Sequence, residues 1–214
     1  MQFPNARILI FAKEPVVGRV KTRLIPALGA EGACQFHADC LEHTVSTRNA
    51  EQIAPVDLVV TPADQHRMCQ KLADKYAMTL YTQCGHDLGE RMAQAAEQAL
   101  RSADYVLLTG TDSPALTKVA IEYALQQMVA GNDAVMIPAE DGGYVLLGLR
   151  RFIAELFTDM PWGTEQVAEI TRKRCEEQGV TLVECPLLWD VDRPEDLVRL
   201  IEFDSRWSQH LPRL

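Results

Sequence analysis

Residues 7–24 read RILIFAKEPVVGRVKTRL, and the fold can be argued from how this stretch begins. Its first part, ILIFA at residues 8–12, is apolar at every position, and VLLTG at residues 106–110 has the same character. A strand with one face in water alternates apolar and polar residues, whereas a strand covered on both faces is apolar throughout. These stretches therefore predict a parallel sheet that lies between two layers of helices.

Short apolar runs alternate with longer amphipathic segments along the rest of the chain. Alternation of strands and helices predicts right-handed crossovers and an α/β sandwich. The predicted strands cover residues 7–12, 56–61, 78–83, 105–109, 134–138, 144–149 and 180–187, and the predicted helices cover residues 30–48, 63–76, 88–102, 117–130, 164–178 and 194–206.

One pair of predicted strands departs from this alternation. Only AEDGG separates residues 134–138 from residues 144–149, and this composition suits a hairpin. The expected fold is therefore a three-layer α/β sandwich with a mixed, mainly parallel central sheet. The chain shows no repeat and no linker composition, so we expect residues 1–214 to form a single domain.

Composition excludes several classes of protein. The net charge of −9, with 30 acidic and 21 basic residues, disfavours a general nucleic-acid binder. No apolar run reaches the roughly 18 residues of a membrane span, and the first residues do not resemble a signal peptide. The six cysteines form no CxxC pair, which favours free thiols in a cytoplasmic protein over a zinc or disulfide framework.

Polar segments with special backbone chemistry follow most of the predicted strands. Ligands of open α/β sheets bind beyond the carboxyl ends of the strands, so these segments are expected to meet at one rim. The segments are KEPVVGRVKTRL (residues 13–24), CGHDLGERM (84–92), GTDSPAL (110–116), AEDGGY (139–144) and WDVDRPEDL (189–197).

The first of these segments concentrates positive charge in an acidic protein. Lys13, Arg19, Lys21 and Arg23 fall within eleven positions around Gly18. Phosphate oxygens require positive charge, and a glycine lets the backbone approach them closely. The segment matches neither a Walker loop nor GxGxxG. We predict a phosphate-binding loop, with a solvated basic loop as the alternative.

Three aspartates on the rim are candidate ligands for a divalent cation. Asp112 follows an apolar strand directly, and Asp190 and Asp192 share one face of an extended segment. Close carboxylates repel each other unless a cation offsets their charge. As an alternative, Asp112 and Asp192 could each cap a following helix, whereas Asp190 has no such role.

Two further segments carry candidates for contact with the rest of the substrate. Gly85, Asp87 and Arg91 are placed to border a nucleoside, although Asp87 also suits a helix N-cap. The hairpin turn and the tryptophan beyond it are the other candidates, with a plain turn and a core side chain as the alternatives. These substrate candidates are Gly142, Gly143, Tyr144 and Trp162.

Taken together, the motifs resemble the bacterial GT-A-fold nucleotide-diphospho-sugar transferase family, which includes arsenosugar-biosynthesis glycosyltransferases. The resemblance runs from about residue 7 to residue 200. More distantly, the chain is similar to molybdenum-cofactor and 2-phospho-lactate guanylyltransferases. The motifs are FAKEPVVGRVKTRL, QCGHDLGERM, GTDSPAL, DGGYVLLGL, PWGT and DVDRPEDL.

The resemblance implies a GT-A-like sandwich with a nucleotide over the first loop. It also implies that Asp112 binds a metal, Mg²⁺ or Mn²⁺, with Asp190 or Asp192 as second ligand. Most glycosyltransferases of this fold carry a DxD pair at this site, whereas this chain reads GTDSP with one carboxylate. We name Lys21 and the three aspartates as catalytic candidates.

The expected function is that of a metal-dependent transferase that uses a nucleotide-activated donor. A glycosyltransferase would move a sugar from a nucleotide-sugar to a small-molecule acceptor. The alternative is a nucleotidylyltransferase, which would join a nucleoside triphosphate to a phosphorylated acceptor and release pyrophosphate. A strongly basic first loop is more typical of this second activity. A binding module without catalysis is disfavoured, because carboxylates and cations are expected at one rim.

Overall fold

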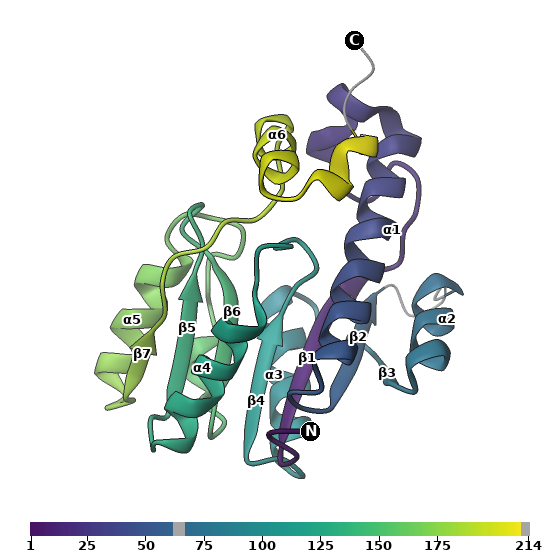
Figure 1. Cartoon of the computed structure of the whole chain (residues 1–214). Coiled ribbons are helices and arrows are strands. Elements are labelled where there is room, and N and C mark those ends of the chain that lie inside the picture. The colour runs from purple at the N-terminus through teal and green to yellow at the C-terminus, as the bar shows by residue number, and fades with distance from the viewer. Residues whose placement is uncertain (62–66, 211–214) are drawn as a thin grey trace.

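The computed structural model describes residues 1–61 and 67–210. The described strands form one mixed sheet in the order β3-β2-β1-β4-β6-β5-β7 (Figure 1). Only β6 is antiparallel to its neighbours, β4 and β5, within this sheet. The strands are β1 (Ala6–Lys13), β2 (Val56–Thr61), β3 (Thr79–Thr82), β4 (Tyr105–Thr109), β5 (Ala134–Pro138), β6 (Tyr144–Leu149) and β7 (Leu182–Glu184).

Helices cover both faces of the sheet, which gives the predicted three layers (Figure 1). One apolar cluster joins α1, α2 and α4 to one face, and another joins α3 and α5 to the opposite face. The α-helices are α1 (Ile25–Glu51), α2 (Arg67–Tyr76), α3 (Leu88–Leu100), α4 (Lys118–Val129), α5 (Val167–Glu177) and α6 (Pro194–Phe203).

The apolar character of β1 follows from its central position. Ile8 and Ile10 point into the cluster with α1, whereas Leu9 points into the cluster with α3. All three side chains are at most 2% exposed. Burial of such a side chain stabilises the fold by about 1.5–3 kcal/mol. The predicted α/β class, mixed sheet and β5–β6 hairpin are therefore confirmed.

Several element boundaries differ from those predicted. Helix α1 begins at Ile25 and contains a break at Gly29, where φ is 71° and ψ is 168°. Strand β7 is only three residues long, shorter than the predicted 180–187. The predicted helix 63–76 begins at Arg67 among the described residues, and its first four positions lie outside them.

A third apolar cluster holds the carboxyl-terminal elements near the rim. Leu24, directly before α1, and Phe36 in α1 pack with Trp189, Leu197 and Trp207. Helix α6 is followed by a short 3₁₀ helix, Ser205–His210, that lies beside the amino-terminal half of α1 (Figure 1). This packing fixes the segment after β7, which carries two of the candidate aspartates.

The structure also bears on the cysteines and on the length of the apolar helices. All six cysteines are free thiols, and four of them are buried. No helix among the described residues is both long and apolar enough to cross a membrane.

Candidate active-site cleft

A cleft of about 710 Å³ opens at the rim where β1 and β4 end and β6 begins. The predicted polar segments meet there, because parallel strands present their carboxyl ends to one edge of the sheet. Four of the candidates, Gly18, Gly85, Asp87 and Gly142, do not line it. The candidates that do line it are Lys13, Lys21, Arg23, Arg91, Asp112, Gly143, Tyr144, Trp162, Asp190 and Asp192.

The basic loop after β1 is anchored at its start by two buried side chains. Both carboxylate oxygens of Glu14 accept backbone N–H groups of α2, from Met68 at 2.6 Å and from Cys69 at 3.1 Å. The His37 ring bonds through Nε2 to the carbonyl oxygen of Lys13 at 2.9 Å. Burial lowers the pKa of His37, so the neutral ring donates this bond through Nε2–H. These bonds hold the loop against α1 and α2.

Lys21 is the most constrained residue of the loop. Its backbone is left-handed, with φ at 45°, and the residue is 9% exposed. Its Nζ lies 2.9 Å from Asp112 Oδ1 and donates a 2.5 Å hydrogen bond to the carbonyl oxygen of Val191. Burial opposes its charge, but Asp112 outweighs burial and raises the Lys21 pKa. Lys21 thus ties together the ends of three segments far apart in sequence.

Asp112 is not the cap of the helix that follows it. Helix α4 begins at Lys118, and the Thr117 hydroxyl accepts the Ala120 N–H. The Asp112 side chain remains 50% exposed beside Lys21. Burial opposes ionisation of Asp112, but Lys21 outweighs burial and lowers its pKa. Asp112 therefore presents a carboxylate to the cleft.

The two aspartates after β7 have different surroundings. Asp192 is paired with the Arg23 guanidinium, and it is Asp196 that accepts the backbone N–H groups at the start of α6. Asp190 has no ion pair among the described residues. Burial raises the pKa of Asp190 to about 6, and the negative charges of Asp141 and Asp112 add to this. All three of these carboxylates line the cleft.

The positions of these carboxylates limit how the expected Mg²⁺ or Mn²⁺ could be bound. Among the described residues, His, Cys, Asp and Glu side chains form no group of three that could hold a metal ion. Mg²⁺ is commonly bound by one or two carboxylates together with substrate phosphates, so a three-ligand cage is not required. Asp190 and the half-exposed Asp112 could therefore bind a cation whose remaining ligands are phosphate oxygens of the substrate.

The segment before α3 has a mainly structural role. The Asp87 carboxylate accepts the Glu90 N–H at 2.8 Å and caps the helix, which confirms the cap reading. A Cβ atom on Gly85, whose φ is 134°, would lie 2.7 Å from the Glu90 Cβ. Arg91 donates its Nε–H to the carbonyl oxygen of Gly85 at 3.1 Å and also lines the cleft.

Two aromatic side chains, Tyr144 and Trp162, line the cleft where β6 begins, and we call this pair the aromatic wall. The Tyr144 and Trp162 rings meet edge to face, with centroids 6.2 Å apart. The Tyr144 hydroxyl lies 3.9 Å from the Met92 sulfur. Trp162 is half-buried and packs near Gly89, so it is both a packed side chain and a cleft residue.

The Gly142→Ala variant is expected to be less stable than the wild-type protein by at least ~1–3 kcal/mol. Gly142 has a φ of 87°, and a Cβ atom there would lie 2.2 Å from the Glu165 carbonyl oxygen. Gly18→Ala is the matched control, because Gly18 has a φ of 75° but open space around it. Urea denaturation measures both. Equal losses in the two variants would show that the Glu165 contact is unimportant.

Several cleft residues were not predicted from the sequence. His37 lies inside a helix, and nothing in its spacing marks it. Gln83 donates its side-chain N–H groups to the carbonyl oxygens of Val59 and Ala12 at 2.9 and 3.2 Å. Asp141 lies in the predicted hairpin turn, and its position beside the paired glycines is the available signal.

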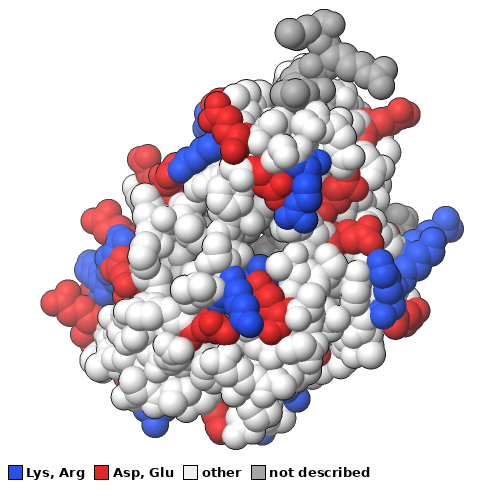
Figure 2. Space-filling view, viewed as in Figure 1, with Lys and Arg blue, Asp and Glu red and all other residues white. Residues whose placement is uncertain are grey.

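The outer surface has no extended basic area on the face shown in Figure 2. Acidic and basic side chains are interspersed there. This distribution agrees with the acidic composition of the chain. Positive charge is instead gathered inside the cleft, on the loop after β1.

The fold and the cleft define an α/β protein of the nucleotide-diphospho-sugar transferase type. A crystal structure from Desulfovibrio desulfuricans G20, described as a "putative nucleotide-diphospho-sugar transferase", matches with a TM-score of 0.84. The two sequences are 27% identical, over 97% of this chain and 98% of that one.

Less similar structures share the fold. A cytidylyltransferase from Leptospira borgpetersenii serovar Hardjo-bovis has a TM-score of 0.64 at 14% identity, covering 99% of this chain and 98% of that one. A CMP:2-keto-3-deoxy-manno-octonic acid synthetase complexed with CTP has a TM-score of 0.59 at 12% identity, covering 94% and 99%. The enzyme class expected from the sequence, a nucleotide-dependent transferase, agrees with the description of the Desulfovibrio structure.

The family model described as "Uncharacterized protein conserved in bacteria (DUF2064)" matches residues 44–164, and the chain belongs to this family. No curated protein sequence matches the chain significantly.

Proposed function

We propose that this protein is a metal-dependent glycosyltransferase that takes a sugar from a nucleotide-sugar donor. One observation carries the proposal: the cleft sets the basic loop after β1 against Asp112 and Asp190. A ligand with several negative charges and a bound cation matches both sides. The donor's diphosphate, with a divalent metal, is such a ligand.

The loop would hold the donor phosphates. Lys13 and Arg19 line the cleft and have no ion pair among the described side chains, so their charges face the ligand. Arg23 is 63% exposed and can share its guanidinium between Asp192 and a phosphate. Lys21 contributes one remaining N–H, since two are used by Asp112 and Val191.

Asp112 and Asp190 would hold Mg²⁺ or Mn²⁺. Such a cation neutralises charge on the leaving phosphate oxygens. The Lys21 ammonium keeps Asp112 ionised and oriented, since it is bonded to the carboxylate and to the backbone of Val191. Preorganised charge of this kind is commonly the largest contribution to catalysis.

The proposed transfer replaces one bond at the sugar by another. The nucleophilic oxygen of the acceptor forms a bond to the anomeric carbon of the donor sugar. The bond from that carbon to the phosphate oxygen breaks, and its electron pair stays on that oxygen. The acceptor proton passes to solvent, and the products are the glycosylated acceptor and a nucleoside diphosphate. The cleft residues position the reactants and stabilise the leaving charge.

The alternative is nucleotidyl transfer, and one observation favours it. The four cations of the basic loop, Lys13, Arg19, Lys21 and Arg23, all line the cleft, and a nucleoside triphosphate would use more of them than a diphosphate. In that reaction an acceptor phosphate oxygen attacks the α-phosphorus, and pyrophosphate leaves. The same loop would bind the triphosphate, and the same aspartates would bind the cation.

Product analysis separates the two reactions. The protein is incubated with a panel of nucleotide-sugars, Mn²⁺ and small-molecule acceptors, and released nucleoside diphosphate is measured. A parallel set uses each nucleoside triphosphate with phosphorylated acceptors, and released pyrophosphate is measured. We expect metal-dependent release of nucleoside diphosphate, which EDTA abolishes. Release of pyrophosphate alone would replace the proposal by its alternative.

A further inference from the structure

The strand order β1-β4-β6 sets the arrangement of the cleft, because the basic loop follows β1, Asp112 follows β4 and Tyr144 begins β6. At one end, the Lys21 ammonium contacts Asp112. Asp112, Asp190 and Asp141 all line the same cleft. Asp141 lies in the turn that leads into Tyr144, where its carboxylate accepts the Gly143 N–H at 2.9 Å. The cleft thus passes from cations to carboxylates and then to the aromatic wall.

The far end of the cleft is apolar. Besides Tyr144 and Trp162 it is bordered by Met92, Val167 and Leu88, of which Leu88 is 42% exposed. Such a surface favours a ligand with an apolar face, because burial of apolar area is the main favourable contribution there. A sugar-phosphate headgroup has little such area to offer.

The cations of the cleft gather on the loop after β1. Among the described residues, Arg91 is the one cation lining the cleft that lies outside this loop, since His37 is neutral. Arg91 donates its Nε–H to Gly85 and also borders a second cavity beside β2 and β3, which lie on the side of β1 away from β6. Asp141 is exposed and has no ion pair among the described side chains. An acceptor bound against the wall therefore meets negative charge.

We infer that the acceptor is a neutral or cationic small molecule with an apolar face, and that it carries no phosphate near its nucleophile. The inference rests on the proposed function, because the cations and metal ligands at the other end are assigned to the donor. It identifies the acceptor subsite as Met92, Tyr144 and Trp162, with Asp141 at its border. Asp141 would exclude phosphorylated acceptors by repulsion between like charges.

Binding of three matched probes tests the inference. Phenyl β-D-glucoside is neutral, tyramine is cationic and phenyl phosphate is anionic, and all carry one aromatic ring. They are titrated by calorimetry into the full chain with Mn²⁺ and saturating nucleoside diphosphate, which fills the basic end. We expect phenyl phosphate to bind at least about fivefold more weakly than the neutral probe, the size expected from one like charge nearby.

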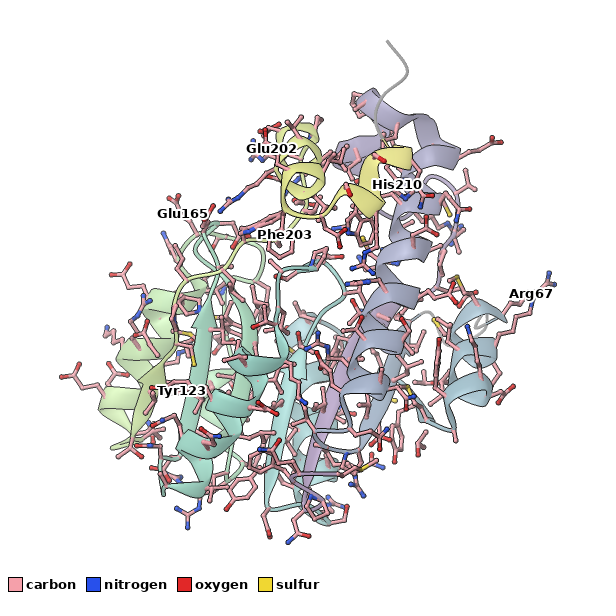
Figure 3. The ribbon with its side chains drawn as sticks, in the orientation of Figure 1. Arg67, Tyr123, Glu165, Glu202, Phe203 and His210 are labelled. Atoms are coloured by element: carbon pink, nitrogen blue, oxygen red, sulfur yellow. The ribbon has the colours of Figure 1, made fainter. Side chains whose placement is uncertain are left out.

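Two variants locate the binding. Asp141→Asn keeps the side-chain oxygen that accepts the Gly143 N–H but removes the charge, so the penalty against phenyl phosphate should fall severalfold. Trp162→Ala should weaken the neutral probe by about tenfold. Tyr123→Ala is the matched aromatic control, because Tyr123 is 42% exposed on α4, below the upper end of the sheet where Glu165 lies (Figure 3).

The outcomes distinguish the inference from the proposed function. Failure of every nucleoside diphosphate to bind would overturn the proposed function. In that case, the affinities of the three probes could still be compared, provided that their binding depends on Trp162. Phenyl phosphate that binds as tightly as the neutral probe, with the same dependence on Trp162, would overturn the inference and leave the donor site standing. If Trp162→Ala does not fold, Leu88→Ala, at an exposed cleft position, replaces it.

Discussion

Asp112→Asn is expected to abolish metal-dependent nucleotide binding and to lower turnover by about a hundredfold or more, the effect of losing charge stabilisation worth several kcal/mol. Asparagine keeps the shape of the side chain but cannot supply negative charge to a cation. Because Thr117 caps α4, loss of the Asp112 charge does not remove a helix cap. Calorimetric titration of a nucleoside diphosphate with and without Mn²⁺ measures the effect.

Asp104→Asn is the matched control for this variant. Asp104 precedes β4 as Asp112 follows it, so the two lie at opposite ends of one strand. The exposed Asp104 carboxylate only accepts a hydrogen bond from Asn5 at 3.1 Å. We expect wild-type binding in the control. Unchanged metal dependence in Asp112→Asn would instead show that Asp112 serves only as the partner of Lys21.

Lys21→Met is expected to lower both stability and nucleotide affinity. The variant leaves Asp112 without its partner and the Val191 carbonyl without a donor. A fully buried pair would lose about 3–5 kcal/mol, but the half-exposed Asp112 is partly hydrated, which reduces the loss to about 1–3 kcal/mol. Loss of one charge-assisted phosphate contact should weaken nucleotide binding by at least about tenfold.

Arg23→Met provides the comparison for Lys21→Met. Arg23 is 63% exposed, so its removal should weaken nucleotide binding without a measurable loss of stability. Urea denaturation and calorimetry are carried out on both variants. Wild-type stability of Lys21→Met would contradict its structural role, and wild-type affinity would contradict its role in phosphate binding.

The layered fold could be predicted because burial on both faces leaves a direct mark on sequence. Ile8, Leu9 and Ile10 are apolar in succession because successive side chains enter opposite clusters. The predicted ends of helices and strands were less accurate. Strand β7 is short because Pro186 has no backbone N–H to donate, although Cys185 and Leu188 on either side of it still donate to the carbonyl oxygens of Met136 and Pro138. Hydrophobicity alone does not report this interruption.

The rim could also be predicted, but the pairings within it could not. The sequence gives no sign that Lys21 would be buried against Asp112, or that Arg23 would take Asp192. Such pairs join residues about 90 and 170 positions apart, so only the folded chain brings them together. His37 was missed for the same reason, since its partner is a backbone carbonyl on another element.

The central claim is that donor phosphates and a divalent cation meet between the loop after β1 and Asp112 with Asp190. A crystal soaked with Mn²⁺ and a panel of nucleoside diphosphates tests it most directly, because the anomalous signal of manganese locates the metal. We predict a manganese peak within bonding distance of Asp112 and Asp190, with phosphates against residues 13–23. A nucleotide bound elsewhere, or manganese away from both aspartates, would contradict the account.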